Sequence, residues 1–302
     1  MAARIVFVTG KGGTGKSSIA SSLAREAALR GETALVIRMA DNAGASDPDE
    51  DTDDSSSGEL RSDDALRGDG ARRSTDARPE VRVLDAHRDL EGFLTRVLGL
   101  SFIVRRLQQS STFGAVAAAA PGLRDLVALT AVTAEARRRR GLVVVDAPAT
   151  GHSLPMLTAP SRVRELTPFG PVAREADFAL RVLADPRAFS ALLVTTPEEL
   201  AITEVRGLRA EVLEAGVGAC RVVVNGLWPA YVSADDGDAI ARSAVSADAT
   251  MHWRRHRRQA SLVEELEREV GRCTRIGFSF GRSIGSTDIA ALFDEVTSGA
   301  AR

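Results

Sequence analysis

Short, continuously apolar runs recur along the 302-residue chain, and they constrain its fold more than any other feature. Strands that leave one face in water alternate apolar and polar residues. Continuous runs are instead typical of strands that a parallel sheet buries on both faces. The runs are RIVFVTG (4–10), TALVIRM (33–39), VRVLD (81–85), LVVVDAP (142–148), ALLVTTP (191–197) and RVVVNGL (221–227), with RIGF (275–278) as a shorter seventh.

Helical patterns separate these runs. Residues 16–30 carry Ile19, Leu23 and Ala27 at four-residue spacing, and residues 198–215 follow a proline and are rich in Glu, Leu and Ala. Because parallel strands need a crossover between them, this alternation predicts a doubly wound α/β fold with a mostly parallel sheet. The hydrophobic fraction of 44% is enough for a sizeable core, and we expect a single domain over residues 1–302.

Two segments interrupt the alternation. Residues 43–79 contain the acidic stretch DPDEDTDDSSSGE and almost no aliphatic side chains, which predicts a disordered acidic insertion. Such an insertion is either an interaction arm or a solvated loop, and a surface loop costs a fold little. Residues 87–141 carry helical patterns and no strand, which predicts a helical subdomain inserted between two strands.

The composition argues against several classes of protein. A net charge of −2 gives no global attraction to nucleic acid or to anionic membranes. Cys220 and Cys273 form no C-x-x-C pair, which fits a reducing compartment. The first apolar run is short and leads into glycines, unlike a signal peptide, and no run reaches the roughly 18 apolar residues of a membrane span. We therefore expect a cytoplasmic protein.

Two basic runs have structural interpretations. RRRR (137–140) stands where a helix should end before a strand, and cations there complement the helix dipole. HWRRHRR (252–258) begins a surface helix that we expect to pack Leu262, Leu266 and Val270 on the sheet. Contacts with nucleic acid for the first run, and with a membrane surface or a partner for the second, are the alternatives.

A glycine-rich loop, GKGGTGKSS (10–18), follows the first predicted strand and opens the first predicted helix. It fits the phosphate-binding pattern G-x-x-x-x-G-K-[ST], in which backbone N–H groups and a helix N-terminus surround a phosphate. Lys16 would contact the β- and γ-phosphates, the Ser17 hydroxyl would bind Mg²⁺, and Ser18 would reach the α-phosphate. The nucleotide-binding residues predicted here are Gly10, Lys11, Gly12, Gly13, Thr14, Gly15, Lys16, Ser17 and Ser18.

Two polar residues end later strands and complete the predicted site. Asp146 follows four apolar residues in LVVVDAP, at the sheet edge where ligands of such folds bind, and is the candidate second group for Mg²⁺. Asn225 ends RVVVN, and its amide can both donate to and accept from the adenine edge. The chain continues as Gly226-Leu227 where a guanine-selective N-K-x-D motif would need lysine, which favours ATP over GTP.

Lys11 followed by GGTGKS resembles the deviant Walker A loop of the SIMIBI class of P-loop NTPases. DAPATGHSL (146–154) resembles the D-T-A-P-T-G-H-T-L element of the ArsA-type ATPases, in which a Walker B aspartate continues into switch II. AAAAPGLRDLVAL (117–129), TTPEELAITE (195–204) and VVVN (222–225) fit the same family. The resemblance covers roughly residues 3–40 and 80–228.

This resemblance implies a Mg-ATP-dependent ATPase that works as a dimer. The first lysine of such loops reaches the nucleotide of the partner subunit, so Lys11 would stabilise charge on the transferred phosphoryl group in trans. Asp146 would hold Mg²⁺ through water, and Thr150, Gly151 and His152 would sense the γ-phosphate. The implied assembly is a homodimer, or a heterodimer with a paralogue, that acts on a client or membrane protein.

The chain also departs from the family pattern. Family members carry D-P-A-H after the second strand, with an aspartate that positions the attacking water. Here the strand continues as ADNAGA, and Asp41 is the nearest candidate for that catalytic role. The C-x-x-C zinc clasp and the cysteines that bind arsenic or an iron–sulfur cluster have no counterparts, so we expect no zinc. We also expect no nucleic acid among the partners, because the net charge is only −2. Two alternatives stay open: a weakly hydrolysing ATP-binding subunit of a heterodimer, and a MinD/ParA-like positioning ATPase.

Overall fold

The computed structural model describes residues 3–39, 79–84, 122–230, 247–280 and 284–298. Asp41, nearly all of the acidic segment 43–79 and residues 87–121 of the predicted helical subdomain lie outside these ranges. The described part of that subdomain contains α5 (Leu123–Arg138). None of the described helices is long and apolar enough to cross a membrane.

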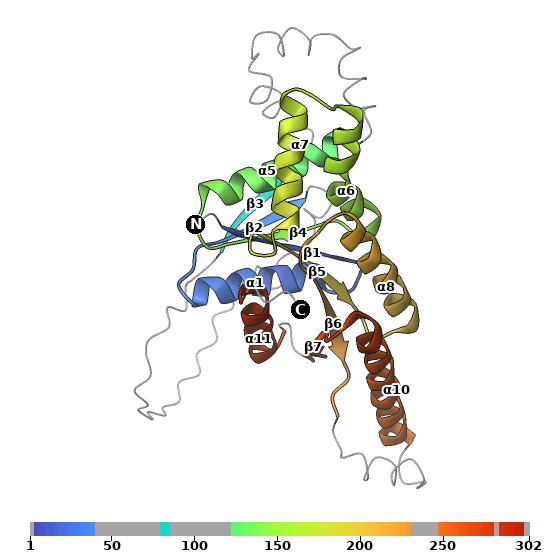
Figure 1. The fold of residues 1–302 in the computed structure, drawn as a ribbon. Coiled ribbons are helices and arrows are strands. Elements are labelled where there is room, and N and C mark those ends of the chain that lie inside the picture. Colours follow the sequence, from blue (N-terminus) through green and yellow to red (C-terminus); the bar gives the residue numbers. More distant parts are fainter. Residues whose placement is uncertain (1–2, 40–78, 85–121, 231–246, 281–283, 299–302) are drawn as a thin grey trace, which may run out of the picture.

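A seven-stranded sheet forms the centre of the molecule, and every strand pairs with its neighbours in parallel (Figure 1). The strand order is β3-β2-β4-β1-β5-β6-β7, so the chain starts in the middle and extends toward both edges. The strands are β1 (Arg4–Gly10), β2 (Ala34–Met39), β3 (Glu80–Leu84), β4 (Leu142–Asp146), β5 (Phe189–Thr195), β6 (Cys220–Leu227) and β7 (Thr274–Gly277). The predicted doubly wound parallel fold is confirmed.

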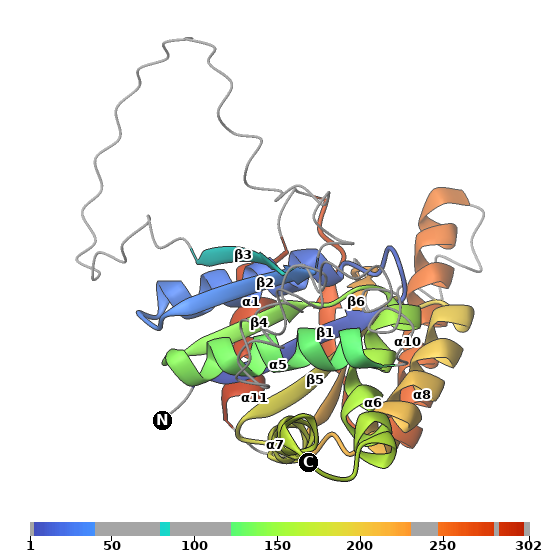
Figure 2. The same cartoon turned by 90° about the horizontal axis from the view of Figure 1, so that it is seen from above.

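Helices cover both faces of the sheet (Figures 1 and 2). On one face α1 (Lys16–Leu29) and α11 (Ser286–Thr297) bury Ile19, Leu23 and Phe293 against the strands. On the other face the chain places α5 and four more helices. Those four are α6 (Thr150–Leu166), α7 (Pro171–Ala184), α8 (Glu199–Glu214) and α10 (Ala247–Val270).

The strand and helix predictions hold with two corrections. All seven predicted strands are present, and their ends differ from the predicted ends by two residues at most. The expectation of burial on both faces is wrong for β3, because β3 is an edge strand whose Val81 and Val83 are exposed. In α10 the stripe expected to pack on the sheet is shifted, since Trp253 and Val263 are buried with Leu266 whereas Leu262 and Val270 are only partly buried.

The basic run 137–140 lies at the end of a helix and before a strand, as predicted. It ends α5, and a nearly buried carboxylate, Glu135, lies in the centre of the charges around it. Glu135 accepts hydrogen bonds from Arg82 of β3 at 2.5 Å, from Arg138 at 3.4 Å and from Arg139 at 3.3 Å. These arginines therefore join the edge strand to the end of α5.

Candidate nucleotide-binding site

Residues 10–15 form a glycine-rich loop between β1 and α1, and its backbone needs glycine at defined points. Gly13 and Gly15 have φ values of +83° and +89°, which side chains with a Cβ rarely adopt. A Cβ on Gly10 would lie 2.1 Å from the Val194 carbonyl oxygen of β5, so the chain leaves β1 tightly against its neighbour. Nothing lies within 4 Å of a Cβ built on Gly12 or Gly13, which leaves the concave side open for a ligand.

Lys16 is the first residue of α1, and its ammonium group turns back into the loop. Nζ donates to the carbonyl oxygen of Lys11 at 2.9 Å, and the Thr14 hydroxyl donates to the same oxygen at 2.9 Å. Burial lowers the pKa of Lys16 below its ordinary value, and the negative charge of Asp146 partly opposes that effect. A buried cation is therefore held beside the loop N–H groups, as phosphate binding requires.

Asp146 ends β4 and is almost fully buried. It lies in register with Val8 of β1 and with Arg38 of β2, so these three side chains leave the same face of the sheet, the face that α1 covers. The electrostatic interaction of Asp146 with Lys16 places the carboxylate near the phosphate loop. The sequence therefore located the acid correctly at the carboxyl edge but gave no sign of Arg38 next to it.

Asn225 reaches the loop from the other side of β1. Its Nδ2 donates to the Thr14 carbonyl oxygen at 2.9 Å, and a Cβ on Gly15 would lie 2.3 Å from that nitrogen. One amide hydrogen of Asn225 thus fixes the loop, while the second hydrogen and the carbonyl oxygen remain for another group. The reading of adenine by Asn225 stays a prediction, and the contact with Thr14 places the residue where that prediction requires it.

The segment DAPATGHSL begins with Asp146, the last residue of β4. A buried pair of hydroxyl groups links it to β1. Thr9 Oγ1 of β1 and Ser153 Oγ of α6 lie 2.5 Å apart, and both side chains are buried. Helix α6 begins at Thr150, so His152 lies exposed in its first turn. The structure brings this segment to the edge of the site, where Ser153 contacts β1.

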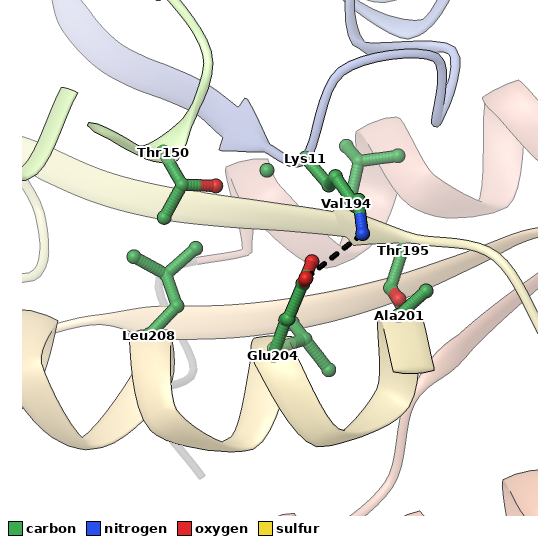
Figure 3. Close-up of a pocket in the computed structure, with 9 residues that line it drawn as sticks. Lys11, Thr150, Val194, Thr195, Ala201, Glu204 and Leu208 are labelled. Atoms are coloured by element: carbon green, nitrogen blue, oxygen red, sulfur yellow. Dashed lines mark hydrogen bonds and ion pairs between the residues drawn. The ribbon is translucent and has the colours of Figure 1, made fainter. Parts of the chain in front are cut away.

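Lys11 points away from its own loop. Its Nζ donates to Glu204 Oε1 of α8 at 2.8 Å (Figure 3). The pair forms one side of a small pocket that Gly10, Thr150, Thr195 and Leu208 also line. Both side chains keep more than two fifths of their surface, 44% for Lys11 and 43% for Glu204, so solvent screens the pair and a new partner can reach it.

The comparisons with known proteins agree with this geometry. Residues 3–63 match the model of a family described as anion-transporting ATPases, the ArsA ATPases. ATPase BagA of Mycobacterium tuberculosis is 28% identical over 254 residues, which cover 82% of this chain and 72% of BagA. A Mycobacterium bovis protein named as an ATPase matches with the same identity and coverage.

The chain is therefore similar to the ArsA-type ATPases over residues 3–63, and to proteins named as ATPases over 254 residues. That similarity supports nucleotide binding, and the residues present suit a nucleoside triphosphate. The open glycine loop offers N–H donors, Lys16 offers a positive charge, and the Ser17 hydroxyl and Asp146 carboxylate are the hard oxygen ligands that Mg²⁺ prefers. Of the predicted site residues, only Asp41 lies outside the described part of the chain.

Sequence reasoning missed three residues of this candidate site: Arg38, Ser153 and Glu204. Glu204 lies in TTPEELAITE, which indicated the family but gave no sign that its last residue meets a lysine 193 positions earlier. Ser153 lies in DAPATGHSL, where the family resemblance assigns γ-phosphate sensing to Thr150, Gly151 and His152 and gives Ser153 no role. The register of β2 with β4 places Arg38 beside Asp146, and the packing of α6 and α8 brings Ser153 to Thr9 and Glu204 to Lys11.

Proposed function

We propose that this chain binds and hydrolyses Mg-ATP and works as a nucleotide-gated dimer that drives or regulates a partner protein. The observation that carries the proposal is that the side chains of the two loop lysines point in different directions. Lys16 turns into its own phosphate loop, whereas Lys11 turns outward to Glu204. A lysine that served only its own phosphates would have no need of this exposed position.

In this proposal the chain's residues act on ATP as follows. The loop amides from Gly12 to Lys16 and the Lys16 ammonium bind the β- and γ-phosphates. Ser17 and Asp146 would hold Mg²⁺, which neutralises charge on the phosphates when bound. Asn225 would orient the base. The α6 N-terminus, linked to β1 through Ser153, would respond to the γ-phosphate and change the surface seen by a partner.

In this mechanism Lys11 makes dimerisation depend on the bound nucleotide. Its ammonium leaves Glu204 and enters the site of a second subunit, where it stabilises negative charge that develops on the transferred phosphoryl group. Two subunits then have complete sites only when they face each other with ATP bound. Dimerisation therefore depends on nucleotide, and hydrolysis releases the pair.

Phosphate release by the purified protein tests the hydrolysis step. With Mg-ATP in excess we expect steady turnover in the wild type and none above background in Lys16→Ala, which loses the cation on the phosphates. Equilibrium binding of ATP to both proteins, measured in parallel, separates binding from hydrolysis. ATP binding without turnover above the Lys16→Ala background would favour a weakly hydrolysing subunit of a heterodimer instead.

A further inference from the structure

Aromatic side chains gather next to Asn225, at the carboxyl ends of β6 and β7. Trp228 follows β6 directly, and Phe278 and Phe280 follow β7. The Phe278 N–H donates to the Leu227 carbonyl oxygen at 2.7 Å, which continues the pairing of the two strands beyond the sheet. A Cβ on Gly226 would lie 4.0 Å from the Phe278 ring, so the ring lies directly beside the residue that follows Asn225.

Trp228 is the fixed member of this group. Its Nε1 donates to His252 Nδ1 at 2.7 Å, its backbone N–H donates to Gln259 Oε1 at 2.8 Å, and its carbonyl oxygen accepts from His256 Nδ1 at 2.9 Å. The His252 ring stacks on it with the centroids 5.2 Å apart, and the Arg255 guanidinium lies 4.3 Å from the indole centroid. Helix α10 thus holds Trp228 in one orientation.

Phe278 and Phe280 form the accessible part of the group. Phe278 packs on Trp228 with a centroid distance of 5.1 Å and is 41% exposed, and Phe280 is 69% exposed. The two phenyl rings lie 5.1 Å apart at 77°, so one presents a face beside the other's edge. Two exposed phenyl rings fixed at a right angle on a rigid support are unusual for a surface with no ligand.

We propose that Phe278 and Phe280 form a stacking platform for the nucleotide base, with Trp228 as its rigid support. This inference rests on the proposed function and adds the residues that would bind the base of the nucleotide. The base would stack on the face of Phe278 while the free amide atoms of Asn225 contact its edge. An aromatic face stacks on any base and most strongly on the large purines.

The position of Asn225 makes the base the favoured occupant over a protein partner. Asn225 already contacts Thr14 of the phosphate loop, so a nucleotide whose phosphates lie in that loop extends toward β6 and β7 when its base meets Asn225. Phe278 is the next ring along this edge. A single face plus one amide reads a purine without the lysine and aspartate of a guanine-selective motif.

Calorimetric titration with Mg-ATP tests the platform. We expect Phe278→Ala to weaken ATP binding about tenfold, because it removes the stacking face, and Phe278→Tyr to bind like the wild type. Phe169→Ala is the matched control, since Phe169 is 86% exposed in the turn between α6 and α7. Magnesium tripolyphosphate, which has no base, should bind wild type and Phe278→Ala equally.

Tryptophan fluorescence gives a second readout that needs no turnover. The chain has two tryptophans, so Trp253→Phe leaves Trp228 as the sole reporter. We expect ATP, but not tripolyphosphate, to change its emission, because only ATP brings a ring next to Phe278. The platform is overturned if Phe278→Ala binds ATP with unchanged affinity, or if it loses as much affinity for tripolyphosphate as for ATP. The two phenyl rings would then be assigned to a protein interface. Absence of ATP binding to the folded wild type overturns the proposed function as well.

Discussion

At the scale of single residues, Glu204 decides where the Lys11 ammonium lies. We expect Glu204→Gln to release Lys11 and to strengthen ATP-dependent dimerisation. The factor is about 1.4- to fivefold for each ion pair released, because an exposed ion pair contributes roughly 0.2–1 kcal/mol. Sedimentation with Mg-ATP measures the effect. Glu265→Gln, which removes one of the two exposed carboxylate partners of Arg206, is the control that should leave dimerisation unchanged. Weaker dimerisation in Glu204→Gln would mean that the carboxylate acts within the dimer instead.

The two cysteines give a residue-scale prediction about pH. Burial raises the pKa of Cys220 to about 11 and that of Cys273 to about 12, where Glu267 adds to the effect. Both groups are therefore thiols at pH 8, and since only the thiolate is alkylated, the rate should rise about tenfold per pH unit up to pH ~10. Iodoacetamide labelling followed by mass spectrometry checks this. The unfolded protein, whose thiols have a pKa of about 8.5, is the reference, and equal rates in both states would contradict the burial.

At the scale of elements, the strands were predictable and the contacts of the helices were not. Runs such as LVVVD predict a buried strand, because a strand that helices cover on both faces needs apolar side chains on both faces. The edge strand β3 carries the same kind of run, yet it is exposed. The local pattern of apolar residues does not tell whether a strand lies at the edge or in the centre of a sheet. The prediction of which α10 residues face inward was wrong for a similar reason. The buried face of α10 includes the polar residue Gln259, which accepts a hydrogen bond from the Trp228 backbone N–H. The position of the glycine loop between β1 and α1 was predictable from the sequence, whereas the contact of Lys11 with Glu204 required the fold.

Glu135 joins two elements and should be important for stability. Glu135→Gln keeps the volume but removes the negative charge that Arg82, Arg138 and Arg139 share. We expect a loss of about 1–3 kcal/mol in the free energy of unfolding, because the carboxylate is nearly buried and its partners lose their counter-charge. Denaturant titration measures this loss. Glu80→Gln removes the exposed partner of Arg139 and should cost at most about 1 kcal/mol. Equal losses would show that burial of Glu135 is not decisive.

At the scale of the whole molecule, the strand order determines which segments can respond to one ligand. β1 lies between β4 and β5, so the phosphate loop, the segment after β4 and helix α8 after β5 meet at one edge. The loop continues into α1 on one face, whereas α6 and α8 lie on the other. A ligand in this crevice touches both layers, which is why such switch points serve as binding sites. Lys11 stands at the same edge and can face a second copy of the chain.

Mixing two inactive variants tests whether Lys11 acts between copies. Lys11→Ala should bind ATP like the wild type, since Lys16 serves its own phosphates, but should not turn over. Asp146→Asn keeps Lys11 but lacks the acid for the metal, so it should also be inactive. In a mixed dimer the Lys11→Ala subunit has an intact Asp146 and receives Lys11 from its partner, so one of its two sites works.

The mixture should therefore regain activity that neither variant has alone. With equal amounts and random pairing, half of the dimers are mixed and each has one working site, so phosphate release approaches roughly a quarter of the wild-type rate per subunit. Lys11→Ala mixed with Lys11→Ala,Asp146→Asn is the control, because no subunit in it can donate the lysine. If Lys11 acts within its own subunit, the first mixture stays as inactive as the control, and loss of ATP binding in Lys11→Ala would point the same way.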